Sequence, residues 1–163
     1  MKLVTATLIA GFVVLTLTLA GSALATDPQV RYPEGYRTWR HVKSMVLEKG
    51  HPLYEAVGGL HNIYANPKAL EGYRTRSFPD GSVIVFDLFE AVHEGEAIAE
   101  GARKAVVVME RDARRFKATD GWGYQVVEPG TRKATLDVKA AADCASCHFS
   151  QKATGFVFSA LRD

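Results

Sequence analysis

Hydrophobic and polar residues alternate in short blocks along the chain, and turn residues separate most of the blocks. The clearest block is 82–89 (SVIVFDLF), which follows a Pro-Asp-Gly turn and is rich in β-branched and aromatic side chains. Such a block predicts a strand. Residues 103–110 (RKAVVVME) predict a second strand, apolar enough to lie centrally. Weaker extended patterns predict further strands over 42–47, 60–65 and 124–128.

Short helices are expected between and after these strands. They are predicted over residues 33–40, 67–73, 112–117 (capped by Asp112) and 137–151. In the first, Tyr36, Trp39 and Arg40 share one face at helical spacing. The second starts with Asn66 as a cap and Pro67 in the first turn. Because the order shows no regular βαβ alternation, we expect an α+β fold, mainly an antiparallel β-sheet with short helices, and not a four-helix bundle.

Composition narrows the class of protein. A chain of 163 residues with 47% hydrophobic and 23% charged residues supports one modest domain and is too apolar to be disordered. The formal net charge of +2 is too even for a nucleic-acid binder. Two cysteines allow at most one internal disulfide, which excludes a disulfide-built miniprotein.

The N-terminus has the pattern of a secretory signal peptide. Lys2 precedes an apolar run over 3–20, and Ser-Ala-Leu-Ala at 22–25 forms a small-residue cleavage site. We therefore predict a signal peptide over 1–25, a mature domain over 26–163, a periplasmic location and no membrane contact after cleavage. An uncleaved membrane anchor is the alternative.

The candidate chemistry lies in Cys144-Ala145-Ser146-Cys147-His148, on the last predicted helix. The C-x-x-C-H run is the attachment signal for a c-type haem. On a helix, Cys144, Cys147 and His148 face the same side. The thiols would form thioethers with one haem c, and His148 would be the proximal iron ligand.

Other uses of the two cysteines fit less well. A zinc site needs four ligands, and no further cysteine is available. A thioredoxin-type dithiol belongs near a βαβ unit, whereas this pair lies close to the end of the sequence. A disulfide would not require the adjoining His148.

The sixth position of such an iron has no obvious ligand. No methionine follows the haem motif, and Met45 and Met109 lie on predicted strands, where methionine usually fills a core. His41, His51, His61 and His93 are further candidates, with His61 the least exposed in appearance. An open site that binds a small ligand is the leading interpretation, without excluding His61, Met45 or Met109.

Several segments resemble the cytochrome P-460 and cytochrome c'-beta family in their order. They are Tyr36-Arg37-x-Trp39, Tyr64-x-Asn66-Pro67, Asp80-Gly81-Ser82-Val83-x-Val85-x-Asp87-Leu88, Asp112-x-x-Arg115-Phe116, Gly121-Trp122-Gly123 and the terminal CASCH. The resemblance covers nearly all of the mature chain. It implies a mainly β monohaem cytochrome, usually a homodimer, with a proximal histidine that corresponds to His148.

The resemblance also implies how the two functional types of this family differ. P-460 enzymes oxidise hydroxylamine and carry a haem–lysine cross-link, but the lysine position here is Phe86. Their distal carboxylate corresponds to Val107. The c'-beta members instead have an apolar distal pocket and a five-coordinate iron that binds nitric oxide or carbon monoxide. Phe86 and Val107 fit that type, because neither side chain can accept a proton. From the residues alone, Phe86 could equally be ordinary core.

Three functions therefore stay open. The first is a cytochrome that binds nitric oxide, carbon monoxide or another small diatomic, with Phe86 and Val107 beside the haem and no catalytic residue. The second is a six-coordinate electron-transfer cytochrome c acting with a redox partner protein, and the third is a hydroxylamine-oxidising enzyme. The basic group at Arg111, Arg114, Arg115 and Lys117 is expected to be a solvated face, with partner docking or haem propionate contacts as alternatives.

Overall fold

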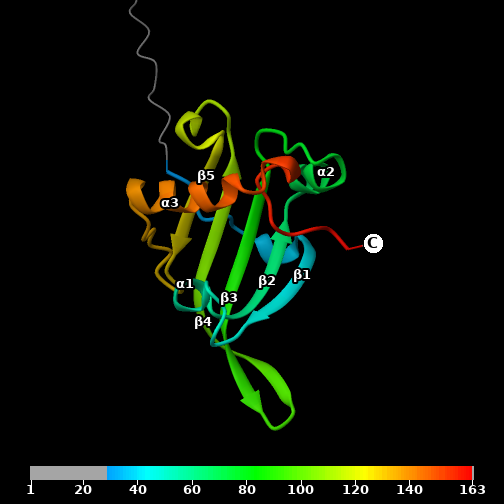
Figure 1. The fold of residues 1–163 in the computed structure, drawn as a ribbon, viewed down its shortest axis with the longest axis vertical. Coiled ribbons are helices and arrows are strands. Elements are labelled where there is room, and N and C mark those ends of the chain that lie inside the picture. Colours follow the sequence, from blue (N-terminus) through cyan, green and yellow to red (C-terminus); the bar gives the residue numbers. More distant parts are fainter. Residues whose placement is uncertain (1–28, 163) are drawn as a thin grey trace, which may run out of the picture.

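The fold is an α+β arrangement built on one antiparallel sheet, as expected. The structure is a computed structural model and describes residues 29–162, so the predicted signal peptide lies outside the described residues. The sheet has five strands in the order β1-β2-β3-β4-β5, each paired antiparallel with the next. Their bounds are β1 Arg40–Leu47, β2 Gly59–Ala65, β3 Val83–Glu94, β4 Ala97–Arg111 and β5 Trp122–Val127 (Figure 1).

Short helices connect or follow the strands. The α-helices are α1 Tyr54–Val57, α2 Pro67–Thr75 and α3 Val138–Phe149, and the 3-10 turns are η1 Tyr36–Thr38, η2 Lys117–Thr119 and η3 Lys152–Thr154. Helix α2 starts as predicted, because the Asn66 side chain accepts the amide of Ala69 and Pro67 occupies the first turn. None of the helices within 29–162 is long and apolar enough to cross a membrane.

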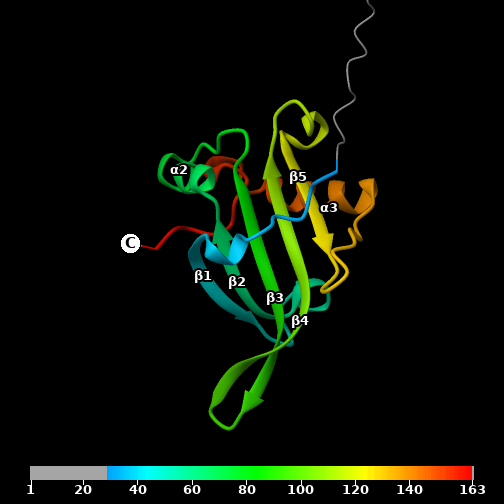
Figure 2. The same ribbon diagram turned by 180° about the vertical axis from the view of Figure 1, so that it is seen from behind.

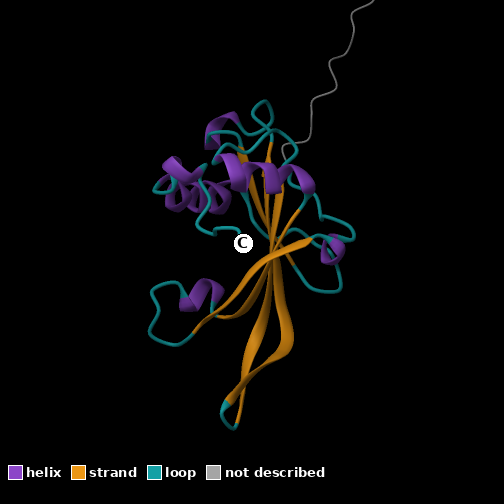
Figure 3. Ribbon diagram, turned by 90° about the vertical axis from the view of Figure 1, so that its right-hand side faces the viewer, coloured by secondary structure: helices purple, strands orange, loops and turns teal. Residues whose placement is uncertain are grey.

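The two faces of the sheet carry different layers. Helix α3 and the C-terminal segment cover one face (Figure 1), and residues 29–39 cross the other (Figure 2). The core under α3 includes Ile63, Ile84 and Met109, whereas Val85, Val106 and Phe116 belong to the core of the opposite face. Helix α1 lies on the α3 side of the sheet, nearer the other end of the strands (Figure 3). We call the side that α3 covers the helix face.

Strands β3 and β4 are longer than predicted and form a projecting hairpin. Their pairing continues to Glu94 and Ala97, and Gly95 adopts a positive φ of 62° in the two-residue turn between them. The hairpin tip extends beyond the other strands in Figures 1 and 2. Its residues are mostly exposed, so no buried face gives them a hydrophobic alternation that a sequence could reveal.

Two of the predicted helices are corrected by the structure. The helix over 33–40 is wrong: only η1 forms, Trp39 is already extended, and Arg40 begins β1. A tertiary contact explains this, because the Tyr36 hydroxyl donates to Asp87 Oδ2 at 2.7 Å and so ties this segment to β3. The segment after Asp112 is a turn followed by η2, not an α-helix, although Asp112 accepts two backbone amides, as a cap does.

Candidate functional site

The predicted haem-attachment residues lie together on α3. Asp137 caps this helix by accepting the amide of Ala140 at 2.8 Å, and alanines occupy much of its length. Cys144, Cys147 and His148 stand three and four residues apart on it, so all three face one side. The helix thereby presents two sulfurs and one imidazole along a single stripe.

Both thiols are free. Cys144 is half-buried against the core of the helix face, and Cys147 is exposed. Burial raises the pKa of the Cys144 thiol, with smaller contributions in the same direction from Asp143 and Cys147. Two reduced thiols on one helix turn are the groups that thioether formation requires.

The tautomer of His148 is fixed by the chain that follows α3. Its Nδ1 atom lies 2.7 Å from the carbonyl oxygen of Phe156. A carbonyl can only accept, so Nδ1 carries the hydrogen and Nε2 keeps its lone pair. Burial lowers the pKa of His148, which favours this neutral form. The ring also lies beside Tyr124 and Phe158, with centroid distances of 5.1 and 4.9 Å. This is the arrangement of a metal-binding histidine.

Phe86 and Val107 lie on the helix face of the sheet. They are directly paired across β3 and β4, and Phe86 is also paired with Ile63 on β2. Directly opposed residues of an antiparallel pair point to the same side. Both side chains are only partly buried, and Phe86 packs against the same core as Cys144. The sheet therefore offers an incompletely covered apolar surface on the side where α3 presents its sulfurs and imidazole.

His61 adds a contact that the sequence did not reveal. It is fully buried, its Nε2 atom lies 2.7 Å from the Val57 carbonyl oxygen, and its ring centroid is 4.0 Å from that of Phe86. Burial lowers the pKa of His61. Its position was noted as a candidate iron ligand, but no local signal could show the contact with Phe86, because that contact depends on the pairing of β2 with β3. Tyr124 and Phe158, beside His148, were missed as well, because their contacts depend on how α3 and the C-terminal segment pack on the sheet.

The other candidates for a sixth iron ligand lie in the core, at the surface next to polar partners, or half-buried on β1. Met109 is 8% exposed in the core beside Ile84 and Tyr124. The remaining histidines have polar partners near the surface: His41 contacts Ser44, His51 accepts the Leu53 amide and His93 contacts Glu48. Met45 is half-buried on β1 and pairs directly with His61.

The basic group divides into two parts. Arg115 forms an ion pair with Glu110 at 2.6 Å, and Arg111 donates to the backbone carbonyl of Asp120. These two side chains stabilise the loop between β4 and β5. Arg114 and Lys117 are exposed, as expected for a solvated face.

Comparison with known families decides the classification. The model of the Cytochrome P460 family matches residues 33–159. The chain belongs to the Cytochrome P460 family. A search of curated proteins finds no significant match. Membership in the Cytochrome P460 family implies a haem cofactor and makes the chain a c-type haem protein.

The residues of this P460-family cytochrome fit a haem. Two free thiols and a histidine whose Nε2 lone pair is available stand on one helix, facing a sheet with a partly uncovered apolar surface. Within residues 29–162, no cluster of three or more His, Cys, Asp or Glu side chains could hold a bare metal ion. Nothing in that part of the chain therefore completes a zinc site around the two cysteines.

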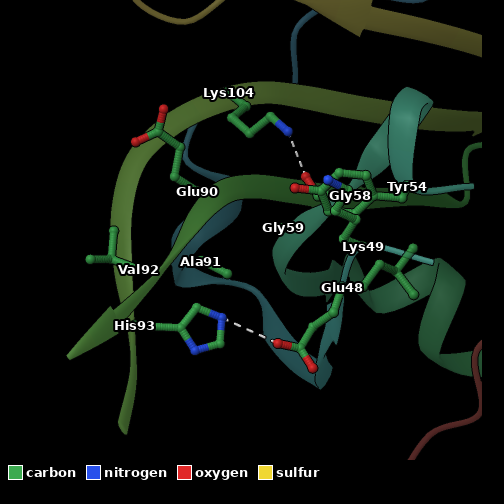
Figure 4. Close-up of a pocket in the computed structure, with 11 residues that line it drawn as sticks. Glu48, Lys49, Tyr54, Gly58, Gly59, Glu90, Ala91, Val92, His93 and Lys104 are labelled. Atoms are coloured by element: carbon green, nitrogen blue, oxygen red, sulfur yellow. Dashed lines mark hydrogen bonds and ion pairs between the residues drawn. The ribbon is translucent and has the colours of Figure 1, made fainter. Parts of the chain in front are cut away.

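A cleft of the P460-family chain lies away from the haem motif. It measures about 710 Å³ and is situated where α1, the end of β1 and the projecting hairpin meet (Figure 4). Lys104 Nζ donates to the Gly58 carbonyl at 2.6 Å on one side, and His93 contacts Glu48 at 3.2 Å on the other. No residue of the haem motif lines this cleft.

Proposed function

We propose that this cytochrome carries one haem c, bound covalently through Cys144 and Cys147, with His148 as the proximal ligand. The tautomer of His148 supports this assignment, because its Nδ1 hydrogen bond to Phe156 leaves Nε2 free and orients the ring. Tyr124 and Phe158 confine the same ring and limit its rotation.

We further propose that the protein binds nitric oxide or another small diatomic at an otherwise open iron position. The haem supplies the iron that binds the diatomic, and the chain supplies the shape and polarity around it. The observation that carries the proposal is the direct pairing of Phe86 with Val107 on the helix face. Neither side chain donates a hydrogen bond or accepts a proton, so this wall admits neutral diatomics by size.

Hydroxylamine oxidation is supported less well. It requires proton transfer, which a positioned base assists. Phe86 and Val107 supply none, and the fully buried His61 is a weak base, because burial lowers its pKa. The protein is therefore proposed as a ligand-binding cytochrome and not as an enzyme.

Electron transfer with a sixth ligand is the second candidate. Met45 favours it, since its direct pairing with His61 puts its side chain on the helix face, and it is not fully buried. In that case the iron would be low-spin and would bind carbon monoxide poorly, and the partner would be a redox protein.

One spectrum separates the two candidates. The absorption of the reduced protein should be that of high-spin haem and should change fully on addition of carbon monoxide. A low-spin spectrum that carbon monoxide does not alter would refute the open site. Met45→Leu would then test whether the methionine is the ligand, because its loss should restore carbon monoxide binding.

Two sets of variants test the assignment of residues. Replacing Cys144 and Cys147 with alanine should abolish haem staining in a denaturing gel, and surviving stain would refute covalent attachment.

Phe86→Ala should speed carbon monoxide binding, because it removes a bulky ring from the helix face. Phe89→Ala is the matched control, since Phe89 is buried on the same strand but stacks with Arg103 on the other face. Equal rates for wild type and Phe86→Ala would return Phe86 to an ordinary core role.

The location and the oligomeric state complete the proposal. We propose export to the periplasm with cleavage after Ala25, and assembly as a homodimer. The intact mass of the exported protein tests the cleavage, and retention of Met1 in a membrane fraction would replace it with an anchor. Sedimentation of the haem-loaded protein tests the dimer, and a monomer at micromolar concentration would refute it.

A further inference from the structure

His61 is placed to restrain Phe86. The imidazole is 0% exposed, and its ring centroid lies 4.0 Å from the Phe86 ring at an interplanar angle of 46°. Phe86 itself is only partly buried. One side of the phenyl ring is therefore fixed by a fully buried neighbour, while the core around it leaves part of its surface uncovered.

Strand register produces this contact. His61 pairs with Leu88, and Phe86 pairs with Ile63, so His61 and Phe86 are diagonal neighbours on the helix face. Diagonal positions on adjacent strands lie within reach of aromatic side chains. The contact thus follows from the β2–β3 pairing and does not depend on a flexible loop.

A single hydrogen bond fixes the imidazole. Because a carbonyl can only accept, Nε2 carries the hydrogen and donates it to Val57 at 2.7 Å. Nδ1 is buried and has no hydrogen-bond partner among the described residues. Burial lowers the pKa of His61, consistent with a neutral ring held from one nitrogen alone.

The acceptor of this hydrogen bond belongs to α1, which is itself tied to the sheet. Val57 is the last residue of α1, and the next carbonyl, that of Gly58, accepts from Lys104 on β4 at 2.6 Å. Figure 4 shows the Lys104–Gly58 bond at the edge of the cleft. The α1 segment therefore provides a fixed point for the His61 ring.

We propose that His61 is a positioning residue that holds the Phe86 ring in place through its hydrogen bond to Val57. The inference rests on the proposed function, in which Phe86 controls access of a diatomic. It assigns no iron-binding role to His61. Both contacts are needed: the hydrogen bond orients the imidazole, and the imidazole limits the phenyl ring.

Two variants separate these contacts. His61→Phe keeps an aromatic ring but loses the donor to Val57, and His61→Gln keeps a donor but loses the ring. Each should raise the rate of carbon monoxide binding about two- to tenfold. For His61→Phe this is the range expected from one lost hydrogen bond, and for His61→Gln it is the range expected from one lost aromatic contact. Neither should exceed the rate of Phe86→Ala. Val85→Ala is the matched control for loss of packing, because Val85 is fully buried beside Phe86 but faces the other side.

Combining the variants tests whether His61 acts through Phe86. In the Phe86→Ala background, His61→Phe and His61→Gln should have no further effect on the rate. Additive effects would overturn the inference, as would an unchanged rate in either single variant when Phe86→Ala is fast. If Phe86→Ala itself leaves the rate unchanged, the proposed function fails, and the structural readouts below still decide the positioning role.

Those readouts do not depend on ligand-binding rates. In the carbon-monoxide-bound, diamagnetic protein, nitrogen NMR should show His61 protonated at Nε2 only. Crystal structures of the two His61 variants should show the Phe86 ring displaced or in more than one rotamer, and Val85→Ala should not. A Nδ1-protonated His61, or an unmoved Phe86 ring in both variants, would overturn the inference.

Discussion

Asp87 is the only buried carboxylate among the described residues, and its loss should strongly destabilise the fold. It lies on β3, facing away from α3, and is 1% exposed. The Tyr36 hydroxyl donates to its Oδ2 atom at 2.7 Å, Arg37 Nη2 lies 3.1 Å from the same atom, and Arg103 Nε lies 2.9 Å from Oδ1. Burial and the bond to Asp87 raise the pKa of Tyr36, so its hydroxyl stays protonated and donates.

The magnitude follows from the groups that Asp87→Ala would leave without an acceptor. The Tyr36 hydroxyl belongs to a residue 2% exposed, and the Arg103 side chain is 24% exposed. Removing one partner of a buried ion pair typically costs about 3–5 kcal/mol. Arg37 adds little, because its side chain is 52% exposed. We expect a loss of about 3–4 kcal/mol in the free energy of unfolding, which lowers Tm by about 10–15 °C.

Asp87→Asn separates charge from hydrogen bonding. Burial raises the pKa of the Asp87 carboxyl, while the Tyr36 hydrogen bond and the charge of Arg37 lower it. The amide keeps an acceptor for Tyr36 but leaves Arg103 without a counter-charge. We therefore expect about half the loss that alanine causes.

Urea unfolding of the haem-loaded protein, followed by far-ultraviolet circular dichroism, measures both changes. Glu34→Gln is the control, because the Glu34–Arg132 pair is exposed and should contribute less than about 0.5 kcal/mol. If Asp87→Ala lost under 1 kcal/mol, or if Asp87→Asn matched wild type, the buried charge would not stabilise the fold.

Three further outcomes are expected. Because burial lowers the pKa of His61, the unfolded chain binds more protons near pH 6 than the folded chain does, so the free energy of unfolding should fall as pH drops from about 7 to 5. His61→Phe should make this pH dependence weaker in urea titrations, and an equal pH dependence in both proteins would contradict the reasoning. Asn66→Ala should lose about 2 kcal/mol, since its side chain accepts two backbone amides and donates to Gly81, whereas Asn66→Asp should lose less in the same assay. Gly72→Ala should lower Tm by several degrees through overlap with the Phe78 ring, and Phe78→Leu in the same chain should recover part of it; an unchanged Tm would mean that the ring moves freely.

Local signals in the sequence were sufficient for the elements that have a strong pattern of their own. The apolar blocks at 82–89 and 103–110 lie within β3 and β4, and the Asn66-Pro67 start of α2 was confirmed. Helix α3 was predicted over 137–151 and spans Val138–Phe149 with Asp137 as its cap. In each case the side chains that specify the element are within a few residues of it.

Elements without such a pattern were misjudged or missed. Helix α1 is a single turn, and the hairpin beyond Phe89 is exposed on most of its surface, so neither has a periodic apolar face. The predicted helix at 33–40 failed because Tyr36 is held by Asp87, a residue that no local rule connects to it.

The grouping of the proposed haem-attachment residues could be predicted from the sequence, because the spacing of Cys144, Cys147 and His148 is local and needs only one helix to bring the three groups to one side. The surroundings of these three groups depend on contacts between distant segments and could not be predicted locally. Pairing of β2, β3 and β4 put Ile63, Phe86 and Val107 on one face and brought His61 against Phe86. A shift of one residue in that register would have turned the same side chains to the opposite face, and no single strand specifies its register without its neighbours.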